Sequence, residues 1–150
     1  MSDEITIRPL QASDAPAWRG LWSDYLTFYN TSVAEAVYET TFARLIGDDD
    51  QDFHALIATA GKRPVGLAHY LFHRHCWRVE NTCYLQDLYT TPDIRGKGVG
   101  RKLISAVYAA ADAAGAPSVY WLTQEDNQTA RQLYDRIGTV TNFIKYQRPA

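Results

Sequence analysis

A glycine-rich segment with four nearby cations is the part of the chain best suited to chemistry. Residues 95–100 read Arg-Gly-Lys-Gly-Val-Gly and lead directly into Arg101 and Lys102. Glycines let the backbone bend and approach a ligand closely, and the first N–H groups of the helix that follows lack partners within it. The helix dipole and the cations add attraction for negative charge. We therefore predict a diphosphate site held by Arg95, Gly96, Lys97, Gly98, Val99, Gly100 and Arg101.

The spacing of the glycines excludes the two commonest nucleotide loops. A P-loop requires a glycine, four further residues and then Gly-Lys-Ser/Thr, and no segment of the sequence has this arrangement. A dinucleotide-binding loop requires G-x-G-x-x-G with an acidic residue about 20 positions later, whereas position 120 here is Tyr120. A simple connector between strand and helix is the remaining alternative, but it needs neither three alternating glycines nor four cations.

The elements around the segment form a β-α-β unit. An apolar strand over 82–90 is stopped by Pro92, a helix over 99–114 follows the loop, and a strand over 118–123 comes next. Such a crossover places its two strands parallel, so the sheet should be mixed. A short helix should then begin near Asp126 or Asn127.

The rest of the chain adds strands and helices to the same sheet. A helix with Pro16 in its first turn carries aromatic residues at three- and four-residue spacing. The remaining predicted elements are a second helix over roughly 32–46 and strands over 4–8, 53–60, 65–72 and 142–148. We therefore expect an α/β (α+β) fold in one domain spanning 1–150, with about six strands in a mixed central sheet and about four flanking helices.

Composition limits the classes of function. The net charge of −2 argues against a nucleic-acid partner, so the cations near residue 95 form a local patch. No apolar run approaches ~18 residues, and the start Met-Ser-Asp-Glu has neither the positive charge nor the apolar core of a signal peptide. We expect a cytoplasmic protein without a membrane partner.

Histidines and cysteines near the middle of the chain do not have the spacing of a metal site. Structural zinc sites pair their ligands closely, as in C-x2-C with H-x3–5-H. The candidates here, which straddle a strand and a loop without such pairs, are His69, His73, His75, Cys76 and Cys83. No metal is expected.

Two segments together resemble the GNAT superfamily of acetyl-CoA-dependent N-acetyltransferases. The main signature of that family is a strand ending in apolar-x-Val-x-Pro, followed by Arg/Gln-x-x-Gly-x-Gly/Ala at a helix start. It is similar to Leu88-Tyr89-Thr90-Thr91-Pro92 and Arg95-Gly96-Lys97-Gly98-Val99-Gly100. A second signature, Asn-x-x-Ala-x-x-Leu-Tyr, is matched by Asn127, Ala130, Leu133 and Tyr134. Residues 83–89, 120–123 and 125–127 also resemble a narrower group of fungal histone or polyamine acetyltransferases and D-amino-acid N-acetyltransferases, with their bacterial relatives.

This resemblance implies acetyl-CoA as cosubstrate and an amine as acceptor, joined by direct attack in a ternary complex. The strand ending at Leu88, Tyr89 and Thr90 would pair with the pantetheine amides, and the N–H near Leu88 would polarise the thioester carbonyl. Asn127 is either a helix cap or a hydrogen-bond partner of the pantetheine, and Ala130 follows it in the matching motif.

Acyl transfer from a thioester to an amine requires two proton transfers. Tyr134 lies at the matching position for a general acid, since a phenol of pKa near ~10 can protonate the departing thiolate. Related enzymes often carry an acidic residue where Asp87 stands, so Asp87 is the candidate general base. Glu125 is an alternative, and a chain of water molecules can replace both.

The acceptor amine is left open by the sequence. Trp77, Arg78 and Glu125 are candidates for contacts with it. Acidic residues at Glu35, Glu39 and 48–52 would favour a polyamine or a lysine-containing peptide, whereas an amino-acid carboxylate would favour a cation such as Arg78 or His73.

Two further expectations concern assembly and the alternative classes. The strand at 142–148 leaves an open sheet edge, and enzymes of the narrower group associate through such C-terminal strands, which implies a homodimer. A non-catalytic acyl-CoA-binding module and a plain interaction domain are the alternative functions, and Tyr134 argues against the first of these.

Overall fold

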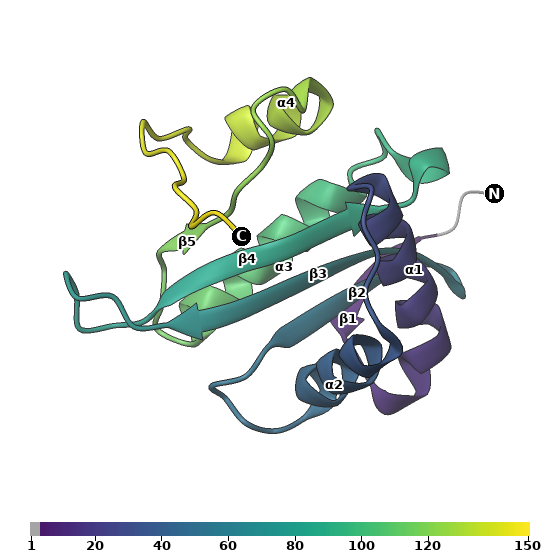
Figure 1. The fold of residues 1–150 in the computed structure, drawn as a ribbon. Coiled ribbons are helices and arrows are strands. Elements are labelled where there is room, and N and C mark those ends of the chain that lie inside the picture. The colour runs from purple at the N-terminus through teal and green to yellow at the C-terminus, as the bar shows by residue number, and fades with distance from the viewer. Residues whose placement is uncertain (1–3) are drawn as a thin grey trace.

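The sheet of this protein contains five strands that follow one another in chain order (Figure 1). The structure is a computed structural model that describes residues 4–150. The strands are β1 (Ile5–Pro9), β2 (His54–Ala60), β3 (Arg63–His73), β4 (Thr82–Thr90) and β5 (Val119–Tyr120). Neighbours pair antiparallel except β4 and β5, which pair parallel. The predicted mixed sheet and the parallel crossover are therefore confirmed.

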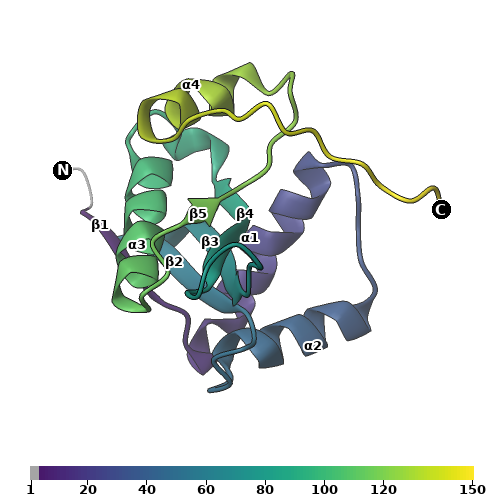
Figure 2. The ribbon, with the colours of Figure 1, turned by 90° about the vertical axis from the view of Figure 1, so that its left-hand side faces the viewer.

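Four α-helices cover the sheet from both sides: α1 (Ala15–Phe28), α2 (Glu35–Ile46), α3 (Val99–Ala113) and α4 (Gln128–Ile137). Figure 2 shows α1 and α2 on one face and α3 on the other, with α4 beyond β5. Short 3-10 turns, Ala12–Asp14 and Pro92–Ile94, precede α1 and the glycine loop. Each face of the sheet therefore has its own apolar core.

The core beneath α3 follows the predicted apolar face of that helix. Its side chains at Val99, Leu103, Ile104, Val107 and Ala111 are all buried. Burial of each Val, Leu or Ile side chain contributes ~1.5–3 kcal/mol, so this face is the main force that holds α3 on the sheet. Gly66 on β3 permits the close approach of α3, because an added Cβ would lie 3.1 Å from Leu103 Cδ1 and 3.2 Å from Val99 Cγ1.

Several element boundaries differ from the sequence predictions. The helix expected from 32 begins at Glu35, and the strands expected at 53–60 and 65–72 are β2 and the longer β3. The strand expected at 118–123 is only Val119–Tyr120, and Tyr120 is exposed.

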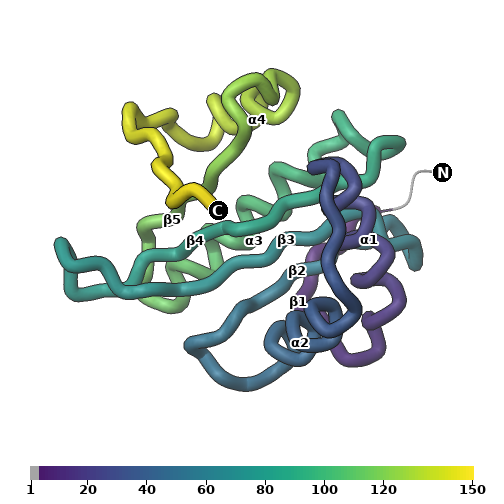
Figure 3. Tube along the Cα trace, viewed as in Figure 1, coloured from purple at the N-terminus to yellow at the C-terminus, as the bar shows by residue number. Residues whose placement is uncertain are grey.

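The largest correction concerns the strand predicted over 142–148. Residues 139–150 form no helix or strand and are exposed, and the sheet of the described residues 4–150 has five strands rather than six. Figure 3 shows this tail as a trace that turns back from α4 without joining the sheet. The two-residue β5 offers too short an edge to hold a further strand, so the apolar pattern of the tail finds no pairing partner within the chain.

A β-bulge in β4 determines which way its side chains point. His69 of β3 faces Asp87, while the next residue, Tyr70, faces Leu85, so Gln86 is the extra residue of β4. Leu85 packs in the core beneath α3, whereas Asp87 contacts α1. Since one inserted residue moves the following side chains to the opposite face, the bulge turns Asp87 and then Tyr89 toward α1.

Candidate active site

A cleft of about 570 Å³ lies between the end of β4, the start of α3, α4 and the last turn of α1. Most of the residues predicted to bind the cofactor line it: Leu88, Tyr89, Thr90, Arg95, Gly96, Gly98, Val99, Gly100, Arg101, Asn127, Ala130 and Tyr134. The end of β4, the loop that leads into α3 and the start of α4, which carry the two motifs, thus meet in one cavity.

The cleft exists because β4 and β5 separate. They pair only at Cys83 with Val119 and at Tyr84 with Tyr120, although β4 continues to Thr90. Among residues 4–150, no strand pairs with this edge of β4 beyond Tyr84, and α4 lies on this side of β4 (Figure 1). An unpaired strand edge can hydrogen-bond an extended ligand that carries amide groups.

The glycine loop at the mouth of the cleft adopts a conformation that only glycine accepts readily. Gly96 has φ 83° and Gly98 has φ 84°, and Gly98 is the residue at which α3 starts. A larger residue in place of Gly100 would crowd α4, because an added Cβ would lie 3.3 Å from Leu133 Cδ2. The free N–H groups of the first turn of α3 thus lie at the cleft, as an anion site requires.

Cations of the loop differ in how firmly they are held. The Arg95 Nε donates a hydrogen bond to the Thr90 carbonyl at 3.2 Å, and its guanidinium lies 5.5 Å from the ring centre of Phe28 and 6.0 Å from that of Tyr89. Arg101 also lines the cleft. Lys97 is exposed and does not line it, so its role in anion binding stays a prediction.

Asn127 caps α4, one of the two roles that the sequence left open. Its side-chain oxygen accepts a hydrogen bond from the backbone N–H of Ala130 at 3.4 Å. This bond fixes the first turn of α4, from which Ala130 and Tyr134 face the cleft. The second motif therefore sets the position of one wall.

Tyr134 lies in the cleft with its ring against Trp121, at 5.5 Å between centroids. Burial, and to a smaller extent the nearby Tyr29, raise the pKa of Tyr134 to about 12. A phenol with this pKa keeps its proton at neutral pH. Tyr134 can therefore act as a hydrogen-bond or proton donor.

Asp87 lies behind the cleft, beneath three tyrosines. It is 9% exposed and receives hydrogen bonds from His69 and Trp22. Burial is the main cause that raises the pKa values of Tyr25, Tyr29 and Tyr84, and the negative charge of Asp87 raises each of them further. Tyr25 and Tyr29 line the cleft, so this carboxylate is near its inner wall.

Sequence reasoning missed the contribution of α1 and of β3. Tyr25, Phe28 and Tyr29 line the cleft although their helical spacing indicates only a core-facing stripe. His69, considered only as a metal ligand, is hydrogen-bonded to Asp87. In the sequence, His69 is distinguished as the one charged or strongly polar residue of the apolar strand over 65–72, and this feature could have indicated its role.

Three predicted acceptor contacts lie outside the cleft. Trp77 is 82% exposed, and with Arg78 it lies in the loop between β3 and β4, at the opposite end of β4 from Thr90 (Figure 1). Glu125 is exposed in the segment before α4, and its backbone carbonyl accepts a hydrogen bond from Arg131. None of the three lines the cavity.

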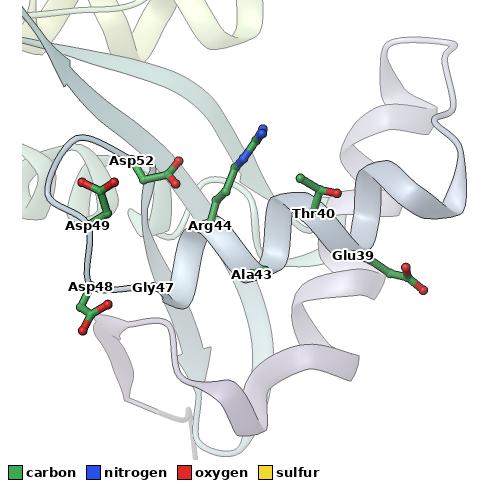
Figure 4. Close-up of a pocket in the computed structure, with 8 residues that line it drawn as sticks. All are labelled: Glu39, Thr40, Ala43, Arg44, Gly47, Asp48, Asp49 and Asp52. Carbon is green, nitrogen blue, oxygen red and sulfur yellow. The ribbon is translucent and has the colours of Figure 1, made fainter.

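An acidic hollow of about 480 Å³ lies at the end of α2, away from the cleft (Figure 4). It is lined by Glu39, Thr40, Ala43, Arg44, Gly47, Asp48, Asp49 and Asp52, and shares no residue with the cleft. Glu35 instead pairs with Arg19. The acidic residues expected to favour a polycation therefore do not surround the cleft.

The part of the chain that the structure describes contains neither a cluster of metal ligands nor a membrane-spanning helix. Within residues 4–150, no three His, Cys, Asp or Glu side chains are grouped as ligands for a metal ion. The helices of this same range are all too short or too polar to span a bilayer.

The open β4 edge, the glycine loop at a helix start and the tyrosine of α4 are the combination expected of an acyl-CoA-dependent transferase. Residues 15–139 match the model of the Acetyltransferase (GNAT) family, so the chain belongs to this family of acetyltransferases. Its members use acetyl-CoA as the acetyl donor. The resemblance found in the sequence is thus confirmed.

Similar proteins of known name include other N-acetyltransferases. The D-amino-acid N-acetyltransferase HPA3 of Saccharomyces cerevisiae is 40% identical over 149 residues, which cover 99% of this chain and 92% of the relative. The uncharacterized N-acetyltransferase YhfO of Bacillus subtilis is 30% identical, with 95% of each chain covered. The thialysine N-epsilon-acetyltransferase of Bos taurus is 31% identical over a shorter match, which covers 57% of this chain and 55% of the relative.

Solved structures share the fold at low sequence identity. The aminoglycoside N-acetyltransferase AAC(6')-Iy in complex with CoA superimposes with a TM-score of 0.84 at 17% identity, covering 99% of this chain and 97% of that one. A ribosomal-protein-alanine N-acetyltransferase from Brucella melitensis gives 0.81 at 18% identity, covering 98% and 100%. The GNAT fold is therefore shown by structure as well as by sequence.

Proposed function

We propose that this protein transfers the acetyl group of acetyl-CoA to a primary amine by direct attack within a ternary complex. The observation that carries the proposal is the single cleft in which the glycine loop, the open edge of β4 and Tyr134 meet, with Asp87 behind its tyrosine wall. The acceptor we propose is a small amine, such as a polyamine or an amino acid, or a lysine side chain.

The donor half of the cleft fits the chemical groups of coenzyme A. N–H groups at the start of α3, with Arg95 and Arg101, would hold the diphosphate. The edge of β4 from Leu88 to Thr90 would pair with the pantetheine amides, and an N–H near Leu88 would stabilise negative charge on the thioester oxygen. Leu88 and Tyr134 line the same cavity, which would bring these groups to one thioester.

Asp87 and Tyr134 would manage the protons of the reaction. A bond forms between the amine nitrogen and the acetyl carbon, and the carbon–sulfur bond breaks. An ammonium acceptor loses two protons in all, one to Asp87 before attack and one to solvent as the amide forms. The thiolate gains one proton from Tyr134, which solvent restores. Because a pKa of about 12 exceeds that of a thiol, Tyr134 would first donate a hydrogen bond to the sulfur as charge develops there.

The candidate acceptors follow from the relatives and from the shape of the site. One named relative is a D-amino-acid N-acetyltransferase and another is a thialysine N-epsilon-acetyltransferase, and both named substrates carry a primary amine. In this chain the acidic hollow lies outside the cleft, so the only buried acid near the cleft wall among residues 4–150 is Asp87. One carboxylate beneath tyrosine rings suits a single ammonium group better than an extended polycation.

An assay of acetyl-CoA consumption with a panel of amines tests this proposal. The panel should include D- and L-amino acids, polyamines, thialysine and lysine-containing peptides, with free thiol measured as product. We expect saturable turnover with at least one primary amine and no turnover with its N-acetylated form. Binding of acetyl-CoA without transfer to any amine would overturn the proposal.

We also propose that two copies associate through the C-terminal tail. Large apolar side chains of the tail are exposed, with Phe143 at 81% and Tyr146 at 89%, and the tail pairs with no strand among residues 4–150. Figure 2 shows the tail extending away from the body of the molecule. A second copy whose tail pairs with this tail would cover these side chains.

Light scattering with size-exclusion chromatography measures this association directly. We expect the full chain to elute at twice the mass of one copy, and the double variant Phe143→Asp, Ile144→Asp to elute as a monomer, because charges prevent apolar burial. The exposed variant Asp50→Asn, in the turn before β2, is the control and should not change the mass. A wild-type chain that is monomeric at every concentration would rule out the dimer.

A further inference from the structure

A buried group of polar side chains lies close to Tyr25 and Tyr29, two tyrosines of α1 that line the cleft. His69 of β3 and Asp87 of β4 face each other in the antiparallel register and are 3% and 9% exposed. Trp18 and Trp22 of α1 cover them, and the two indole rings stack at 5.3 Å between centroids. Two strands and one helix therefore contribute to a single polar cluster within the apolar core.

The hydrogen bonds of this cluster fix the tautomer of His69. The indole N–H of Trp18 can only donate, and it lies 2.9 Å from His69 Nε2. Nε2 must then be the unprotonated nitrogen, so the proton is on Nδ1, which donates to Asp87 Oδ2 at 2.8 Å. Trp22 Nε1 donates to this same Oδ2 at 3.3 Å, and Oδ1 takes part in neither bond.

A catalytic histidine would need a free nitrogen to receive a proton. Here one nitrogen of His69 is occupied by Trp18 and the other by Asp87, and the ring is buried. His69 therefore cannot relay a proton between Asp87 and the cleft. Its N–H and that of Trp22 instead hold one oxygen of the carboxylate and stabilise its charged form.

We propose that His69, locked in its Nδ1-protonated tautomer by Trp18, is the positioning residue that orients and keeps charged the carboxylate of Asp87 for the acceptor ammonium. This inference rests on the proposed function, in which Asp87 receives a proton from the amine. The titratable groups that face Asp87 are His69 from β3, Tyr25 and Tyr29 from α1, and Tyr84 from β4. Both tyrosines of α1 line the cleft, so the carboxylate lies close to the cleft wall.

Nuclear magnetic resonance of the ¹⁵N-labelled full chain tests the tautomer without any substrate. Long-range ¹H–¹⁵N correlations distinguish a protonated from an unprotonated ring nitrogen, and the signals that disappear in His69→Gln identify this ring among the four histidines. We expect protonated Nδ1 and unprotonated Nε2 at neutral pH. A proton on Nε2 would overturn the proposal, whatever the enzyme turns over.

Two substitutions at His69 then test the positioning role. His69→Phe removes the donor to Asp87, and we expect at least a 10-fold lower kcat/KM for the amine, with the acid limb of its pH profile moved to higher pH. The limb moves this way because a carboxylate that loses a donor holds its proton more strongly. His69→Gln offers one donor and one acceptor, and we expect its limb to stay in place and its rate to stay within about threefold of wild type.

The acetyl-CoA site and a matched variant provide the controls. The KM for acetyl-CoA should stay within about twofold in both variants, because His69 does not line the cleft. His54→Phe makes the same change in a half-buried histidine of β2 that stacks on Tyr70, on the other face of the sheet, and should keep the wild-type profile. A wild-type acid limb in His69→Phe, or an equal shift in His69→Gln, would overturn the proposal.

These results separate the inference from the function on which it rests. Absence of turnover with every amine would refute the proposed function, whereas the tautomer measured in the free protein would still be informative. Turnover with an amine, combined with an unchanged profile in His69→Phe, would refute only the role of His69. If His69→Phe does not fold, the tautomer and the His69→Gln profile still decide the question.

Discussion

Tyr29 connects the two groups that would move protons in this active site. It interacts with Tyr134 on α4 and with the charge of Asp87 on β4, and it lines the cleft together with Tyr134. Tyr134 lines the cleft, whereas Asp87 lies behind the part of the cleft wall that Tyr29 helps to form. At the scale of single residues, one tyrosine therefore links the proposed acid to the proposed base.

Tyr134→Phe should lower kcat for acetyl transfer by about 100-fold while leaving the KM for acetyl-CoA nearly unchanged. The phenyl ring preserves the contact with Trp121 and removes only the hydroxyl that would reach the leaving sulfur. Steady-state kinetics with the best amine of the panel measures both constants. Tyr70→Phe, at a buried tyrosine outside the cleft, should retain wild-type kcat. Equal kcat values in Tyr134→Phe and wild type would show that Tyr134 is not the acid.

The sequence was informative where chemistry requires a fixed spacing. Asn127, Ala130 and Tyr134 repeat at helical intervals, and the glycines alternate before a helix, so both walls of the cleft could be predicted. The neighbours of Asp87 could not, because they depend on a bulge at Gln86 that no local pattern indicates. The C-terminal strand was wrong because pairing depends on a free edge elsewhere, whereas alternation is only a local property.

At the scale of elements, the loop that leads into α3 depends on backbone conformation more than on side chains. An added Cβ at Gly98 would meet no atom within 4 Å, yet its φ of 84° is unfavourable for any residue with a side chain. The strain of Gly98→Ala is therefore in the backbone alone. This backbone strain would occur at residue 98, directly before the first free N–H groups of α3.

Gly98→Ala should reduce the free energy of unfolding by about 1 kcal/mol and weaken acetyl-CoA binding several-fold. Thermal or denaturant unfolding gives the first value and calorimetric titration the second. Gly20→Ala is the matched control, because Gly20 lies within α1 with no atom near an added Cβ. There alanine should stabilise the chain by about 0.5–1 kcal/mol and leave binding unchanged. Stabilisation by Gly98→Ala would contradict this account of the loop.

At the scale of the whole molecule, two cores share one sheet, and an ion pair near its first strand helps to join them. Arg8 of β1 donates two hydrogen bonds to Asp14, at 2.7 and 2.9 Å, and the Gln11 N–H donates a third at 2.8 Å. Asp14 precedes α1, which carries the core on one face, while Ile7 of β1 packs into the core on the other. We propose that residues 1–150 unfold as one domain, so a local change here alters the stability of the whole chain.

The Arg8–Asp14 pair should make that stability depend on pH. Hydrogen bonds from Arg8, then from the Gln11 backbone, hold the pKa of Asp14 below its usual value. A carboxyl whose folded pKa is lowered contributes stability above its unfolded pKa of ~3.9, and this contribution is lost as pH falls through the folded value.

Asp14→Asn should therefore lower the free energy of unfolding by about 1 kcal/mol at pH 7. On acidification to pH 3, the free energy of unfolding of this variant should fall by less than that of wild type. Urea unfolding at several pH values measures both effects, with Asp50→Asn as an exposed control that should change stability by less than ~0.5 kcal/mol. Parallel pH curves for Asp14→Asn and wild type would show that this pair does not contribute to the acid sensitivity of the fold.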